Sequence, residues 1–169
     1  TESPDFPVTE GSFDTSFNGA RSWGGDVFLT KLNPSGTDII FSTFIGGEVQ
    51  ETVGTGGIKL DSKGNIIIAG TTSSQNFPLT KGVIENNDNL HAFISKFSPD
   101  GKELLFSTFF GNSQREGVGG LAIDDKDNIY MTGGTYTADL SVTNNAFRKE
   151  IMTPKSGMLM DHYIARIDH

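Results

Sequence analysis

Three aspartates in one short stretch, Asp124, Asp125 and Asp127, form the densest group of residues that could do chemistry. Closely spaced carboxylate oxygens on a short loop are the ligands that Ca²⁺ prefers. The spacing departs from the Asp-x-Asp-x-Asp-Gly calcium loop, because Lys126 takes the third position and no Glu follows at the twelfth. We therefore favour a solvated turn between two strands, with a calcium site as the alternative.

Two glutamates, Glu51 and Glu116, lie 65 residues apart in matching sequence surroundings. Paired carboxylates serve general acid and base catalysis in many hydrolases, but a residue that recurs with a repeat more often fixes the same turn in each copy. The histidines His91, His162 and His169 share no motif, and the absence of cysteine excludes disulfides and thiol catalysis. We expect no catalytic residue and no cofactor.

Large apolar side chains occur in the long stretches whose length and sequence differ along the chain. They are Phe13, Phe17, Trp23, Met158 and Met160. Aromatic and methionine side chains are enriched in the centres of protein interfaces. These residues are therefore the candidates for contact with a partner, which we expect to be a protein or a glycan.

The composition favours an all-β fold and argues against two classes of partner. The 169 residues include 21 glycines and 13 phenylalanines, and no segment has clear helical periodicity. With 21 acidic and 13 basic side chains the formal net charge is −8, which repels phosphate backbones. No run of about 18 apolar residues occurs. We expect neither a nucleic-acid partner nor a membrane span.

The chain repeats itself, and the repeat decides its organisation. Residues 58–72 and 121–135 share one pattern: an alternating apolar stretch, a turn that begins with Asp and ends with Asn, and a return strand rich in β-branched residues. Each predicts a β-hairpin. Residues 26–32, 91–97 and 161–167 repeat a further strand, and Lys31, Lys96 and Arg166 recur within it. We expect these cations to form structural ion pairs with the repeated acids.

The repeat divides the chain into units 1–47, 48–112 and 113–169, of which only the second is complete. They should supply two, four and three strands, nine in all, with a connection over residues 46–57. Apolar residues follow one another directly within the strands, which predicts burial on both faces, as in a propeller blade packed between two neighbours. The predicted fold is all-β: tandem four-stranded antiparallel blades of a β-propeller, with an incomplete ring.

Equivalent aromatic residues should form equivalent layers between the blades. Phe28, Phe93 and Tyr163 occupy the same position of the repeated strand, so we expect all three to be largely buried. An incomplete ring would leave strand edges open, which invites association. We therefore expect the remaining blades to come from a longer chain, or from another component of an assembly.

These motifs together resemble the bacterial β-propeller repeat called SBBP. The matching pattern is apolar-x-apolar-Asp-x-x-Gly-Asn-apolar-x-apolar-x-Gly-x-Thr, then Phe-Pro-x-Thr, then Asp-x-Phe-apolar-x-Lys, then Phe-Ser-Thr-Phe-apolar-Gly-Gly. Departures are Asp127 for the turn glycine, His91 for the strand-opening Asp, and Asn112 for the last Gly. The resemblance implies a secreted or cell-surface bacterial protein, often large and modular, and it implies no particular catalysis.

Two functions from different classes follow. The favoured one is a non-enzymatic binding or scaffold module of an exported bacterial surface protein, which contacts a protein or glycan through its variable loops. The alternative is a propeller enzyme, a hydrolase or lyase of polysaccharides, with its site at the central channel. An enzyme of that kind needs site residues that break the repeat, and the inner strands supply no catalytic pair of this kind.

Overall fold

The structure is a computed structural model that describes residues 1–19, 25–80, 90–111, 116–136, 140, 142–150 and 160–167. These described residues form nine strands and no helix. The strands are β1 (Val27–Leu32), β2 (Ile39–Ile45), β3 (Glu51–Leu60), β4 (Ile66–Thr72), β5 (His91–Phe97), β6 (Leu104–Phe110), β7 (Glu116–Ile123), β8 (Ile129–Thr135) and β9 (Asp161–Ile167).

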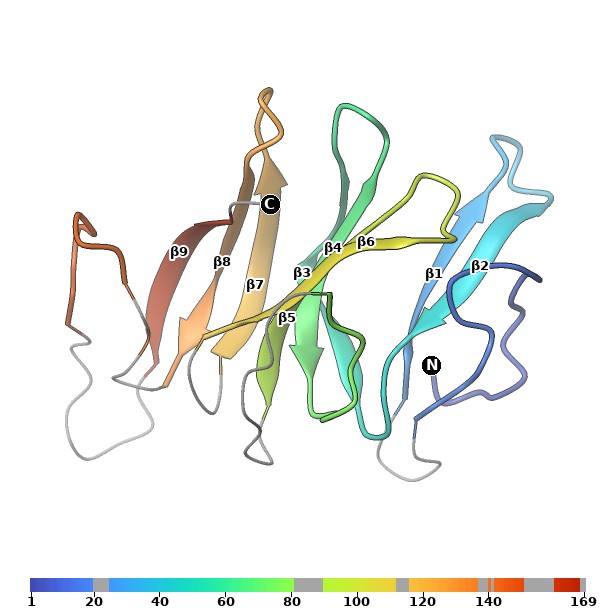
Figure 1. Cartoon of the computed structure of the whole chain (residues 1–169), viewed down its shortest axis with the longest axis horizontal. Coiled ribbons are helices and arrows are strands. Elements are labelled where there is room, and N and C mark those ends of the chain that lie inside the picture. The colour runs from blue at the N-terminus through green and yellow to red at the C-terminus, as the bar shows by residue number, and fades with distance from the viewer. Residues whose placement is uncertain are drawn as a thin grey trace.

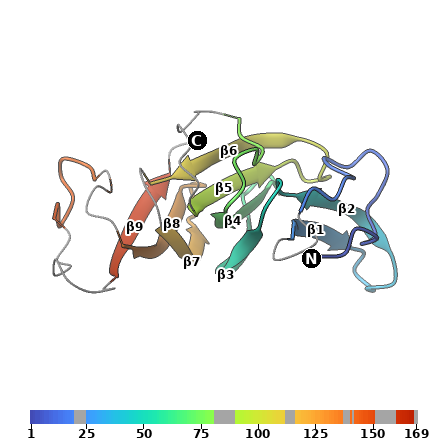
Figure 2. The ribbon, with the colours of Figure 1, turned by 90° about the horizontal axis from the view of Figure 1, so that it is seen from below.

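The strands make three antiparallel sheets that follow one another along the long axis of the molecule (Figures 1 and 2). The first sheet is β1-β2, the second is β3-β4-β5-β6 and the third is β7-β8-β9, so each strand pairs with its neighbour in the chain. None of the three sheets closes on itself. The all-β fold and the division into two, four and three strands are therefore confirmed.

The first strands of the second and third sheets, β3 and β7, begin earlier than the sequence pattern predicts. The pattern places a connection over residues 46–57, but β3 already starts at Glu51. Its pairing with β4 shifts register between Val53 and Ile58, and the pairing of β7 with β8 shifts between Val118 and Gly120. A bulge of this kind breaks the alternation by which a strand is recognised in a sequence.

Equivalent aspartates close the hairpin turns of the second and third sheets, as the repeat predicts. Asp61 Oδ1 accepts hydrogen bonds from the backbone N–H groups of Lys63 at 3.0 Å and Asn65 at 2.9 Å, and Asp61 Oδ2 accepts one from Asn65 Nδ2 at 2.8 Å. Asp124 makes the same three bonds in its own turn, at 2.8 to 3.0 Å. The two turns therefore fix the same register in their hairpins.

A buried ion pair ties β5 to the turn of the second sheet. Lys96 Nζ lies 2.8 Å from Asp61 Oδ2, and both side chains are nearly buried. Burial raises the pKa of Asp61, but the bond from Lys96 and those from Asn65 and Lys63 outweigh it and lower the pKa to about 2. The structural ion pair predicted for Lys96 is confirmed. Lys31, at the equivalent position of the first sheet, is exposed.

The Phe-Pro-x-Thr motif covers the outer strand of the first two sheets. Thr80 N–H donates to the Ser107 carbonyl at 2.9 Å, and Ser107 N–H donates to Thr80 Oγ1 at 2.7 Å. Thr9 and Ser42 make the same pair of bonds on β2, at 2.9 and 3.0 Å. Because an open strand edge invites pairing with another chain, the motif also protects these edges.

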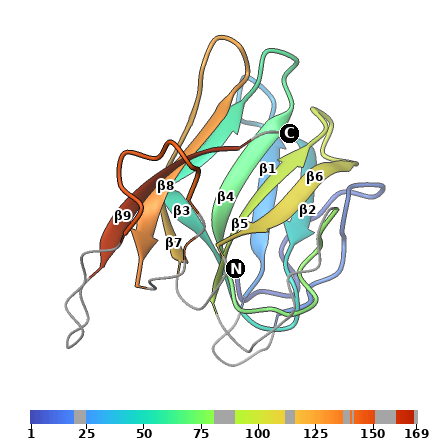
Figure 3. The same cartoon turned by 60° about the vertical axis from the view of Figure 1, so that its left-hand side comes forward.

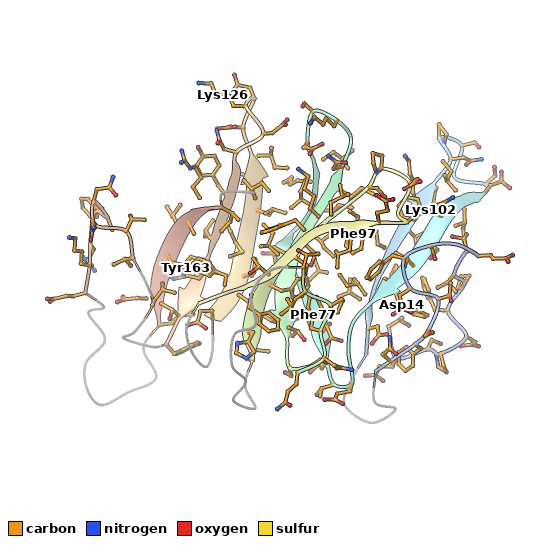
Figure 4. All side chains as sticks on the ribbon, in the orientation of Figure 1. Asp14, Phe77, Phe97, Lys102, Lys126 and Tyr163 are labelled. Carbon is orange, nitrogen blue, oxygen red and sulfur yellow. The ribbon has the colours of Figure 1, made fainter. Side chains whose placement is uncertain are left out.

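Two hydrophobic clusters lie on opposite faces of the second sheet. Ile66 and Ile68 belong to the first cluster, which joins the first and second sheets, and Ile67 belongs to the second cluster, which joins the second and third. Successive residues of a strand point to opposite faces, so β4 contributes to both. The side chains between the first two sheets include Phe77 and Phe97 (Figure 4). The second sheet is therefore buried on both faces.

The three equivalent aromatic residues are not equally buried. Phe93 is fully buried and Tyr163 is 8% exposed, but Phe28 is 45% exposed, so the prediction is wrong for Phe28. β5 lies between β4 and β6, whereas β1 pairs with β2 alone, and one side of Phe28 therefore has no strand to cover it. The Phe28 ring still lies 4.3 Å from that of Phe6, close to the 4.5 Å between Phe93 and Phe77.

The difference in burial between Phe93 and Phe28 can be tested with one substitution at each position. We expect Phe93→Ala to lower the free energy of unfolding by about 3–5 kcal/mol, because it empties a fully enclosed volume. Phe28→Ala, at the equivalent position, should lower it by only about 1–2 kcal/mol, because much of that ring is already in water. Urea denaturation of both variants measures this. Equal losses, or a loss below about 1 kcal/mol for Phe93→Ala, would contradict the described packing.

A second matched pair tests the buried ion pair. Lys96→Met should lower the free energy of unfolding at pH 7 by about 3 kcal/mol, because it leaves the Asp61 carboxylate buried without its cation. Lys31→Met removes the equivalent but exposed cation and should change it by less than about 0.5 kcal/mol. Denaturant titrations of both variants at pH 7 give the comparison, and equal effects would contradict it.

The ion pair between Asp61 and Lys96 makes the free energy of unfolding depend on pH. The pKa of Asp61 is about 2 in the folded chain and has an ordinary value of 3.8. A lowered pKa contributes stability that is fully present above pH 3.8 and is lost as pH falls towards 2. The difference between the parent chain and Lys96→Met should therefore shrink between pH 4 and pH 2. A difference that stays constant over this range would show that the carboxylate is not held by the lysine.

Candidate functional site

Buried ionisable residues gather at the end of the sheets opposite the hairpin turns. Asp26 precedes β1 and is fully buried, and Glu51 opens β3 and is 5% exposed. His91 opens β5 and Glu116 opens β7, and both are also buried. Because the burial of an ionisable group is unfavourable without compensation, such residues are the first candidates for a functional site.

Each glutamate is held by a threonine on the neighbouring strand. Glu51 Oε1 accepts a hydrogen bond from Thr72 Oγ1 at 2.7 Å, and Glu51 N–H donates to the Gly25 carbonyl at 3.0 Å. Glu116 Oε1 accepts one from Thr135 Oγ1 at 3.4 Å. The residues of each Glu–Thr pair lie directly opposite one another in the sheet. The repeated glutamates therefore make a cross-strand link, where the sequence predicts a role in a turn.

Asp26 and Glu51 converge on Gly46, which follows β2. A β-carbon placed on Gly46 would lie 2.5 Å from Asp26 Oδ1 and 2.7 Å from Glu51 Oε2, so glycine is what leaves room for both carboxylates. Asp26 Oδ2 accepts a hydrogen bond from the Asn18 N–H at 2.8 Å. Burial raises the pKa of Asp26, the bond from Asn18 lowers it, and the charge of Glu51 raises it, so the net shift is upward.

The junction between the second and third sheets has a histidine in place of the aspartate. His91 is buried, and its ring stacks on that of Phe109 with centroids 4.8 Å apart and planes inclined by 15°. Gly111, with φ of +95°, takes the place that Gly46 has at the first junction. A β-carbon on Gly111 would lie 2.6 Å from Glu116 Cδ. Both junctions therefore place a glycine against a buried glutamate, but only Gly111 has φ in the left-handed region, and His91 stands where the first junction has Asp26.

The aspartates proposed as calcium ligands lie in the β7–β8 turn and face different partners. Asp124 holds its own turn and also accepts a bond from the Tyr130 hydroxyl at 3.2 Å. Asp127 accepts bonds from Ser62 N–H at 2.8 Å and Ser62 Oγ at 2.5 Å, which lower its pKa, and Asp125 is exposed. In the described part of the chain no three acidic or histidine side chains are placed to hold a metal. Calcium at this turn stays a prediction.

The residues predicted to contact a partner differ in how far they are exposed. Phe13 packs edge-on against Phe97 with ring centroids 5.4 Å apart, and Phe17 packs in the same way against Phe44 at 5.8 Å. Both are half-buried. Met160 is exposed. The other two candidates, Trp23 and Met158, lie outside the described residues. Part of the aromatic surface expected for a partner therefore packs on the sheets themselves.

Two cavities lie beside strands that have a free edge. One, of about 510 Å³, lies between β1 and β3 and is lined by Phe28 and Ile58 among others, and one of about 810 Å³ lies beside β9 and is lined by Phe147 and Ile164 among others. In the second sheet, β4 and β6 cover both edges of the equivalent strand β5. Among the described residues, β1 and β9 each pair with a strand on one edge only, and the two cavities lie beside these strands.

Comparison with family models and with curated proteins finds no match to this chain. The likeness to the SBBP repeat thus rests on the sequence motifs alone. Among the described residues there is no helix with the length and apolarity needed to cross a membrane.

Proposed function

We propose that the chain is part of an SBBP-like β-propeller and that it acts as a non-enzymatic binding or scaffold module of an exported bacterial surface protein. One observation carries the proposal. Tight hairpin turns lie at one end of the sheets, and the connections that vary in length, residues 73–90 and 136–160, leave from the other end (Figure 1). Loops on a constant scaffold are where binding surfaces usually lie.

The contact between neighbouring sheets supports the propeller part of the proposal. β3 and β7, the first strands of their sheets, lie side by side (Figure 3). A β-carbon on Gly56 would collide with the backbone of Leu121, and Thr55 Oγ1 donates to the Gly119 carbonyl at 2.6 Å. Close approach of successive first strands is what blades arranged around a common axis require.

The free edges of β1 and β9 support the expectation of further blades. Phe28, Val53 and Ile58 line the cavity beside β1 and are each more than a third exposed. Apolar groups beside an open edge invite pairing with another strand. We propose that strands of further repeats, from a longer chain or from another component of an assembly, fill these positions.

The polysaccharide hydrolase or lyase is less well supported. Asp26 and Glu51 lie close together, but neither breaks the repeat as such an enzyme requires, because Glu116 and Asp161 occupy matching positions. Both acids are also buried among strands of two sheets. A sugar ring needs both carboxylates within reach at once. The burial of this pair therefore favours a binding module over an enzyme.

A loop exchange tests the proposed function. Replacing residues 136–160 by residues 73–90 changes the loop end and leaves the strands intact, whereas Lys63→Ala with Lys126→Ala changes two exposed residues at the turn end (Figure 4 labels Lys126). Binding of the parent chain to panels of polysaccharides and of purified bacterial surface proteins is measured by biolayer interferometry. We expect the exchange to weaken the strongest binding at least about tenfold, or about 1.4 kcal/mol.

The double lysine variant is the control and should bind like the parent chain. Equal losses in both variants would place the contact away from the loops. Turnover of any polysaccharide in the same panel, measured by the release of reducing ends, would contradict the non-enzymatic proposal and favour the enzyme.

A further inference from the structure

The carboxylates of Asp26 and Glu51, which we call the junction acids, are buried between the first and second sheets. Asp26 is fully buried and Glu51 is 5% exposed. Asp26 Oδ2 accepts a bond from the Asn18 N–H, and Glu51 Oε1 accepts one from Thr72 Oγ1. Asp26 Oδ1 and Glu51 Oε2 have no hydrogen-bond partner among the described residues.

These two oxygens face each other across Gly46. Each lies within 2.7 Å of the position that a Gly46 β-carbon would take. The two oxygens are therefore at most about 5 Å apart, and an ion with metal–oxygen distances of about 2.4 Å spans such a gap. Both acids also line the cavity beside β1, which gives the pair a route towards solvent.

Two buried carboxylates at this distance need a positive charge or a proton between them. Within the described chain, the ion pair between Lys96 and Asp61 involves neither junction acid. The Thr1 ammonium donates to the main-chain carbonyl of Asp26, at 2.7 Å, and not to either of the two facing oxygens. The ammonium charge acts on Asp26 more weakly than burial and the neighbouring carboxylates do, so the pair still lacks a balancing charge.

The next junction points to the nature of that charge. His91 and Glu116 stand there in place of the two acids, 65 residues further along the chain. An imidazole can carry the positive charge that balances a buried glutamate. The first junction has a second acid, Asp26, at the position that the histidine takes in the second. A bound cation would supply at the first junction the charge that a side chain can supply at the second.

We propose that Asp26 Oδ1 and Glu51 Oε2 bind one hard divalent cation, of the Ca²⁺ or Mg²⁺ class, that ties the first sheet to the second. Carboxylate oxygens are the preferred ligands of both ions, and water or main-chain carbonyls complete their shells. The site is separate from the β7–β8 turn and from the loop surface proposed to bind a partner. Its test therefore does not depend on that partner.

Calorimetry on the chelator-treated chain at pH 7.5, with CaCl₂ or MgCl₂ as titrant, measures the site. We expect one ion per chain and a rise in the thermal unfolding midpoint on its addition. Asp26→His copies the second junction and should abolish the binding while the chain stays folded by circular dichroism. His91→Asp copies the first junction and should raise the stoichiometry to two, and a further Glu116→Gln should return it to one.

The two ions distinguish the chemistry of the site. Tighter binding of Ca²⁺ supports a site with several protein oxygens, and tighter binding of Mg²⁺ supports a site that keeps most of the ion's water. Binding that survives Asp26→His would reveal adventitious surface ions only and would overturn the proposal. Absence of any binding, together with a rise in the unfolding midpoint for Asp26→Asn, would also overturn it and would assign a shared proton to the junction acids.

Discussion

The first hairpins of the second and third sheets, β3–β4 and β7–β8, each depend on one carboxylate in the turn. Asp61 accepts hydrogen bonds from two backbone N–H groups and one side-chain amide, and it pairs with Lys96 from the third strand of its sheet. Hydrogen bonds to a charged group are the stronger ones in proteins. Because a slip by one residue would move every side chain to the other face, these bonds also decide which face each residue of β4 covers.

That register lets the second sheet bury both faces. Ile66 and Ile68 pack towards the first sheet, while Ile67 packs towards the third. Each sheet thus supplies the apolar surface that its neighbour needs, and no single sheet could bury its own. Phe28 is exposed for the same reason, because its strand has only one neighbour. At the opposite end, the junction acids are located by strands from both of the first two sheets.

The sequence predicted what depends on local pattern. The strands, the turns closed by Asp61 and Asp124 and the ion pair of Lys96 follow from periodicity and turn chemistry that recur along the chain. It did not predict the start of β3, because glycines and a bulge interrupt its alternation. The convergence of Asp26 and Glu51 was also missed, since it depends on the register of strands in two sheets. The signal was present as the histidine that replaces the aspartate in the next unit.

Amide hydrogen exchange at pH 7, followed residue by residue by NMR, tests the central claim that the second sheet is the stable core of a stack. Amides of β4 and β5 should be the slowest to exchange, since they open only with global unfolding. The amides of β1 that do not face β2, and those of β9 that do not face β8, should exchange orders of magnitude faster. Protection of β1 and β9 equal to that of β4 and β5 would contradict the account.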